Sequence, residues 1–239
     1  MSKKLKIVGL AVFAVCAFMA VSASGASAIP PNWTVETTGG TVSIPSAGSS
    51  IGCELMPTST EATSTLEVPG LLTLSGKGLH VEGCALTGPE TDTVKKITFT
   101  NVVVGNVNCQ VRGLTNGDAI GTISTVPLAS KLVRIGTITY DTFTPEAETN
   151  GLFVEIEVTP KSGVSCPVSG KYKIKGSVNA TVPASGTLAT ERTLIFNKPD
   201  EEVTKASDKL TFGPGAVESF LTVTAALRQT NDLKWGVDW

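Results

Sequence analysis

Two carboxylates are the sharpest catalytic candidates in this sequence. Glu155 and Glu157 alternate with apolar residues in the segment FVEIEV. On a β-strand, side chains two residues apart share one face and lie about 6.6 Å apart along the strand. Glycosidases use two carboxyl groups separated by roughly 5 to 9.5 Å. The spacing therefore supports one hypothesis for function, a carbohydrate-active protein that is either lectin-like or a hydrolase.

A cationic stripe on a second expected strand offers a competing explanation. The stripe consists of Lys171, Lys173 and Lys175, which alternate with Tyr172 and Ile174. If the chain turns back between 159 and 170, the lysines and the two glutamates face each other outside a hairpin. We favour this arrangement, in which opposite charges pair across strands and neither set is a functional site. The segment 159–170 is long for a hairpin loop, so a different partner strand is the alternative.

The single histidine has no partners for nucleophilic catalysis. His80 lies in LHVEGCAL, where alternation places it on one strand face with Glu82 and Cys84. A Ser-His-Asp triad would have to use this histidine, and no G-x-S-x-G elbow is present to supply the serine. The sequence also lacks a nucleotide-binding glycine loop and a metal-ligand motif. We therefore predict no cofactor and no metal, and we lean against an enzyme.

Four cysteines follow the N-terminal region, namely Cys53, Cys84, Cys109 and Cys166. They are far apart in the sequence and form no close ligand pair such as CxxC, so they do not match a metal site. An even number of cysteines in an exported chain predicts two disulfides. Three connectivities are possible. We favour Cys84–Cys109 with Cys53–Cys166, because the first pair closes the shorter loop.

The N-terminal segment 1–28 has the three parts of a secretory signal. Lysines precede an apolar stretch at 7–21, and Ala26-Ser27-Ala28 follows as a small-x-small cleavage site. A membrane-spanning helix needs about 20 apolar residues, so this stretch is too short for a stable anchor. We expect cleavage after Ala28, no stable membrane insertion after signal removal, and a protein that is secreted or held at the cell surface.

The remaining residues, 29–239, have the pattern of β-strands throughout. Thr, Val, Ile and Gly dominate, and apolar and polar residues alternate between turn signals such as Asn116-Gly117-Asp118 and Asn150-Gly151. Turns at intervals of about 8 to 15 residues are typical of an all-β sandwich. We predict a single all-β domain, an antiparallel β-sandwich with two disulfides.

Composition restricts the class of partner. The formal net charge is −2, which does not fit a nucleic-acid-binding protein. Aromatic residues make up only 5% of the chain, which is few for a protein that stacks sugars. We therefore expect an exported, non-enzymatic binding or structural module. A cell-wall polymer or glycan is the partner considered, and nucleic acid is excluded.

Several segments carry a resemblance to known proteins. They are VEGCALTG at 81–88, CQVRGLTNGDAIGTISTVPLASKL at 109–132, FVEIEV at 153–158, KIKGSVNATV at 173–182, and the ending TFGPGAV…WGV at 211–237. In these segments the chain resembles a group of exported proteins of unknown function from actinobacteria. The resemblance implies a signal-bearing, cysteine-containing, all-β fold. It implies no activity, cofactor or catalytic residue.

Overall fold

The computed structural model describes residues 30–146, 149–182, 187–197 and 209–238, and these residues form antiparallel β-sheets. The predicted all-β class and the presence of two disulfides are confirmed. The expected signal segment, including the cleavage site at Ala28, lies outside the described residues. Within the described part of the chain, no helix is long and apolar enough to cross a membrane.

Eight strands of the largest sheet form a closed ring. In ring order they are β3 (Ile51–Leu55), β6 (Leu79–Leu86), β7 (Thr91–Phe99), β11 (Leu128–Ile135), β12 (Ile138–Pro145), β15 (Val178–Val182), β16 (Glu191–Phe196) and β19 (Phe220–Gln229). Pairing of β16 with β19 closes the ring, from Glu191 opposite Arg228 to Phe196 opposite Val223. The sandwich prediction therefore holds for strand content and antiparallel pairing, whereas the ring replaces the two open sheets of a sandwich.

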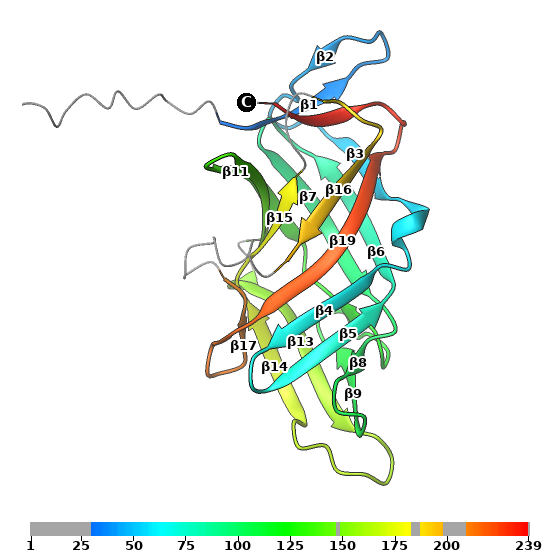
Figure 1. Cartoon of the computed structure of the whole chain (residues 1–239), viewed down its shortest axis with the longest axis vertical. Coiled ribbons are helices and arrows are strands. Elements are labelled where there is room, and N and C mark those ends of the chain that lie inside the picture. Colours follow the sequence, from blue (N-terminus) through cyan, green and yellow to red (C-terminus); the bar gives the residue numbers. More distant parts are fainter. Residues whose placement is uncertain (1–29, 147–148, 183–186, 198–208, 239) are drawn as a thin grey trace, which may run out of the picture.

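Strand β19 also extends the sheet beyond the ring. Its C-terminal half pairs with β3, and its N-terminal half pairs with β4 (Thr63–Val68). From β4 the sheet continues through β5 (Leu72–Lys77) to β8 (Val103–Val104), while β10 (Ile123–Ser124) pairs with β7. A short 3₁₀ turn, η1 (Pro57–Ser59), precedes β4. In Figure 1, β19 runs diagonally from the ring to the β4–β5 hairpin.

Two smaller sheets lie at opposite ends of the molecule (Figure 1). One contains β9 (Cys109–Gly113), β13 (Leu152–Pro160), β14 (Gly170–Lys175), β17 (Thr211–Phe212) and β18 (Val217–Glu218). The other contains β2 (Val42–Ser43), β1 (Asn32–Glu36) and β20 (Trp235–Asp238), in that order. This second sheet joins the two ends of the described chain and covers one end of the ring.

Side chains fill the interior of the ring. Alternate residues of each strand point into the ring. In β19, for example, Leu221, Val223, Ala225 and Leu227 point inward and the threonines point outward. Phe143 and Phe196 meet inside with ring centroids 5.6 Å apart. Two apolar cavities within this core measure only about 50 and 30 Å³. The ring is thus a packed core and not an open ligand chamber.

The disulfides connect different cysteines from those predicted. Cys53 bonds Cys84, and Cys109 bonds Cys166, with Cα–Cα distances of 5.0 and 5.2 Å. Cys53 and Cys84 lie directly opposite each other on the antiparallel strands β3 and β6. Cys109 begins β9, and Cys166 lies in the loop between β13 and β14. The predicted pairs, Cys84–Cys109 and Cys53–Cys166, are wrong because strand register decides which cysteines meet, not loop length.

The alternation in β6 changes phase at Gly83, which has a φ of +66°. Leu79 faces the core before this glycine, and Cys84 faces it afterwards, while His80 is exposed. The predicted grouping of Cys84 with His80 on one face is therefore wrong. A Cβ at Gly83 would come within 2.6 Å of the Cβ of Lys95 on β7, so this conformation requires glycine.

Candidate functional site

Two buried aspartates lie at one end of the ring, on strands β7 and β12, which flank β11. Asp92 on β7 is opposite Ser130 on β11, and Asp141 on β12 is opposite Leu132 on β11. All four side chains point inward, and only 4% of Asp92 and 1% of Asp141 are exposed. Carboxyl groups are rarely buried to this degree without a compensating charge. This carboxyl pair, Asp92 and Asp141, is the most unusual chemical feature of the described residues.

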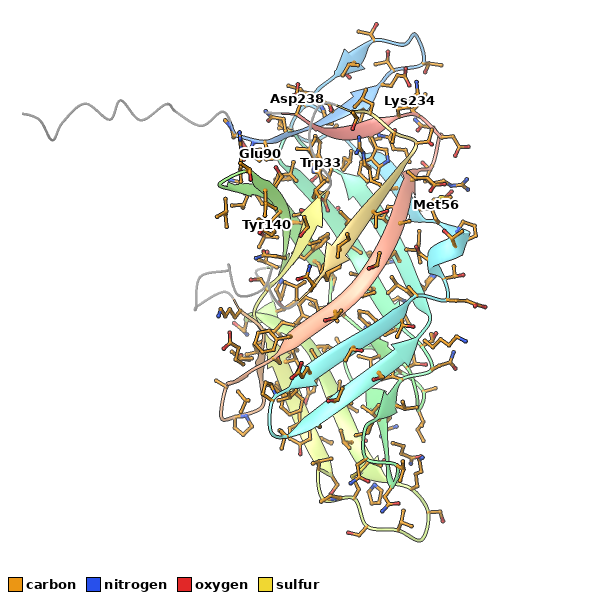
Figure 2. The ribbon with its side chains drawn as sticks, viewed as in Figure 1. Trp33, Met56, Glu90, Tyr140, Lys234 and Asp238 are labelled. Atoms are coloured by element: carbon orange, nitrogen blue, oxygen red, sulfur yellow. A yellow bond between two sulfur atoms is a disulfide. The ribbon has the colours of Figure 1, made fainter. Side chains whose placement is uncertain are left out.

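Two tryptophans from the sheet of β2, β1 and β20, which we call the end sheet, close the space above the carboxyl pair. Trp33 on β1 and Trp235 on β20 are each 1% exposed, and their ring centroids are 5.4 Å apart. Figure 2 shows Trp33 at this end of the molecule, beneath the strands of the end sheet. Both tryptophans, both aspartates and the Cys53–Cys84 disulfide line a cavity of about 20 Å³. A cavity of this size has room for a water molecule and not for a substrate.

Polar atoms around the carboxyl pair are incompletely paired. Atoms without a hydrogen-bond partner in the structure are Asp92 Oδ2, Asp141 Oδ1, Ser130 Oγ, Thr139 Oγ1 and Trp33 Nε1. The Ser130 hydroxyl and the Trp33 indole N–H still lie close enough to Asp92 to lower its pKa, although their geometry falls short of a formed hydrogen bond. A water molecule in the adjoining cavity could bond to such atoms.

Burial shifts the titration of both aspartates upward. Loss of solvation raises the pKa of Asp92 to about 6, and the Asp141 carboxyl interacts with it directly. Loss of solvation and then the negative charge of Asp92 raise the pKa of Asp141 well above its ordinary value. Two carboxylates that interact in a dry site cannot both ionise readily. The pair therefore retains a proton under conditions in which surface aspartates are fully ionised.

A buried arginine lies near the same end of the ring without neutralising the pair. Arg192 on β16 is 6% exposed, and its Nε donates a hydrogen bond to the Trp235 carbonyl oxygen at 2.9 Å. Burial lowers the pKa of Arg192. Gln229 on β19 is fully buried as well. Among the described residues, no cationic side chain forms an ion pair with Asp92 or Asp141.

The predicted glutamates occupy a different sheet from the carboxyl pair. Strands β13 and β14 form the predicted hairpin, with Glu155 opposite Lys173 and Glu157 opposite Lys171. Glu157 bonds instead to Arg112 on β9, which donates to its Oε2 from Nε at 2.9 Å and from Nη2 at 2.7 Å. The predicted antiparallel pairing of the two strands is confirmed. The predicted glutamate–lysine ion pairs are not observed, because Arg112 forms the ion pair with Glu157.

The three lysines of the stripe are exposed along the outer face of β14. Among the residues that the structure describes, none of the three is within 4.0 Å of a carboxylate oxygen. His80 is also exposed, opposite Thr98 on β7. No group of three or more His, Cys, Asp or Glu side chains could hold a metal ion within the described ranges. The structure thus leaves the three lysines and His80 exposed, on two different sheets.

Sequence reasoning missed the carboxyl pair, although a signal was present. Asp92 has the same alternation phase as Val94, and Asp141 has the same phase as Phe143, so both acids occupy the apolar register of their strands. Their proximity could not be read from the sequence, because it depends on β11 lying between β7 and β12.

Comparison with known proteins adds no functional assignment. No family model, no curated protein and no solved structure matches the chain. Function must be inferred from the residues and their positions.

Proposed function

We propose that this chain is an exported, non-enzymatic protein of the cell surface or extracellular medium, acting as a binding or structural module. The observation that carries the proposal is the pair of disulfides, Cys53–Cys84 and Cys109–Cys166. Disulfides form and persist in oxidising compartments and are rare in the cytosol. The signal features of residues 1–28 agree with this location, as does the resemblance to exported actinobacterial proteins.

Export has a direct test. The signal sequence predicts that secreted protein begins at Ile29, after cleavage behind Ala28. Expression in a Gram-positive host, followed by N-terminal sequencing of the protein from the medium or the wall, measures this. Recovery of the protein only inside the cell with Met1 retained would contradict the proposal.

The positions of the acidic side chains support a non-enzymatic role. The carboxyl pair lies beneath Trp33 and Trp235, where no substrate can reach it. Glu157 accepts two hydrogen bonds from Arg112, which hold its carboxylate against β9. A surface groove of about 440 Å³ lies elsewhere, between the β4–β5 turn, β8 and Pro167, and neither candidate glutamate lines it.

The lysine stripe suggests the chemistry of a partner. Lys171, Lys173 and Lys175 project from one strand face, with spacing close to the strand repeat of about 6.6 Å. A row of exposed ammonium groups attracts repeating negative charge, such as that of an anionic cell-wall polymer. The alternative is a carbohydrate-active protein using Glu155 and Glu157, which the same face carries on β13.

A binding array of glycans and cell-wall polymers separates these alternatives. We expect the mature protein to bind anionic polymers, with binding reduced at least about tenfold in the triple variant Lys171→Ala/Lys173→Ala/Lys175→Ala. The matched control, Lys77→Ala/Lys95→Ala/Lys234→Ala, removes the same charge from other parts of the surface. Equal loss in both variants, or binding that does not depend on salt, would contradict a role for the stripe. Hydrolysis of a glycan that Glu157→Gln abolishes would favour the carbohydrate-active alternative.

A further inference from the structure

The sheet of β2, β1 and β20 contacts the ring mainly through the side chains of Trp33 and Trp235, which cover one end of it. Strand β2 connects to β3 through residues 44–50, and β20 connects to β19 through residues 230–234. The pairs Trp33–Val237 and Val35–Trp235 hold β1 and β20 to each other. The sheet can therefore move as a unit without breaking any strand pair of the ring.

Within the described ranges, a small set of hydrogen bonds joins Trp33 and Trp235 of the end sheet to the rest of the molecule. The Trp33 N–H donates to the Pro89 carbonyl oxygen at 2.6 Å, and a single antiparallel bridge joins Trp235 to Ala189. The Trp235 indole donates to the Thr190 carbonyl oxygen at 3.3 Å, and Arg192 donates to the Trp235 carbonyl oxygen. All of these contacts involve Trp33 or Trp235, the two end-sheet residues that line the cavity beside the carboxyl pair.

Charged side chains on the surrounding strands do not compensate the pair. The outward-facing ion pairs at this end are Glu90–Lys131, Glu36–Lys234 and Glu54–Arg228, with Arg228 also bonding Asp232. Asp238 on β20 is exposed, and the cysteines of β3 and β6 are joined in the disulfide. Arg192 on β16 is the inward-facing cation, and it is directed at Trp235. Only the two aspartates titrate among the residues that line the cavity.

We propose that the end sheet is a pH-sensitive lid, closed while the carboxyl pair holds a proton and opened when both aspartates become ionised. In the closed form, Trp33 and Trp235 shield both carboxyl groups from bulk solvent. Full ionisation places two negative charges together away from bulk solvent, which is strongly unfavourable. Lifting the lid admits water to both carboxylates and relieves this cost while the ring stays paired.

The direction of the effect follows from the upward shift of both titrations. A group that binds its proton more tightly in the closed form stabilises that form at low pH and ceases to do so as pH rises. For each proton released on opening, the opening equilibrium grows by at most about tenfold per pH unit. Closure is therefore expected in acid, and opening begins as pH rises through the titration of the pair.

Hydrogen exchange of the oxidised protein between pH 5 and 9, corrected for intrinsic exchange rates, tests the proposal. We expect protection of the β1 and β20 amides to fall by up to about tenfold per pH unit, while β7 and β11 keep their protection. Acrylamide quenching of Trp33 and Trp235, in a Trp239→Phe background, should rise over the same range. Equal loss of protection in the ring would mean global unfolding and would overturn the lid.

Variants connect the response to the pair itself. Asp92→Asn/Asp141→Asn should keep the lid closed at every pH tested, and Asp141→Asn alone should weaken the dependence. The matched control Asp232→Asn removes an exposed acid at the same end and should leave the wild-type response unchanged. Protection that is independent of pH in the wild type, or an unaltered response in the variants, would contradict the proposal. The wild-type measurement decides the question even if the double variant does not fold.

Discussion

At the scale of single residues, Asp92 makes stability depend on pH in the direction opposite to that of most acidic groups. Its pKa of about 6 in the folded protein exceeds the ordinary 3.8, so the folded state binds more protons between these values. The contribution of Asp92 to the free energy of unfolding is then greatest below about pH 4, and it falls as pH rises towards 6. Exposed, ion-paired acids such as Glu82, whose pKa Lys96 lowers, act in the reverse sense.

We predict that Asp92→Asn reduces the loss of stability between pH 4.5 and 7.5. A shift from 3.8 to about 6 corresponds to about 3 kcal/mol of pH-dependent stability, which the amide cannot lose because it does not ionise. Urea unfolding at both pH values measures the difference. The same experiment on Asp232→Asn is the control. The same change in the free energy of unfolding between the two pH values in the wild type and in Asp92→Asn would contradict the assignment.

Residue patterns predicted the features of the structure that depend on residues close together in the sequence. The hairpin of β13 and β14 was predictable because both strands alternate in phase, which brings Glu157 opposite Lys171. The partner of Glu157 was not predictable, because Arg112 comes from β9, which is 45 residues away in the sequence. The carboxyl pair was hidden for the same reason, since its two members meet only across β11.

At the scale of elements, the sheet of β9, β13 and β14 is cross-linked by the Arg112–Glu157 ion pair. A double-mutant cycle between Arg112→Ala and Glu157→Ala should give a coupling of about 0.5 to 1 kcal/mol, because the glutamate is only 18% exposed. The parallel cycle between Lys173→Ala and Glu157→Ala should give a value near zero. Unfolding in urea at low salt measures both, and the reverse ranking would contradict the observed pairing.

The end sheet depends on a glycine where it meets the ring. A Cβ at Gly236 on β20 would lie 2.5 Å from Arg192 Nη2 and 2.9 Å from the Thr187 carbonyl oxygen. We therefore predict that Gly236→Ala destabilises the protein by about 1 to 3 kcal/mol, as expected for overpacking a filled core. Gly39→Ala is a matched control in the β1–β2 turn, where a Cβ would meet nothing within 4 Å. Thermal unfolding compares the two, and equal effects would contradict the close contact.

At the scale of the whole molecule, non-local pairing defines the architecture. The alternation in residues 220–229 indicates a strand, but nothing in it indicates that β19 pairs with β3, β4 and β16. That triple pairing closes the ring and extends the sheet beyond it. The sequence was therefore sufficient to predict strands and insufficient to distinguish a ring from a sandwich.

The two disulfides lie towards opposite ends of the molecule, and we expect each of them to stabilise the fold. Cys53–Cys84 ties neighbouring ring strands beneath the lid, while Cys109–Cys166 fastens the loop between β13 and β14 to β9. Closing loops of 31 and 57 residues should contribute about 4 kcal/mol each through the unfolded chain. Cys109→Ala/Cys166→Ala and Cys53→Ala/Cys84→Ala should each lower the free energy of unfolding by about that amount. Peptide mapping without reduction should recover these two pairs, and a Cys84–Cys109 peptide would contradict the observed register. Because only Cys53–Cys84 borders the cavity, its removal should also loosen the lid, whereas removal of Cys109–Cys166 should leave exchange of β1 and β20 unchanged.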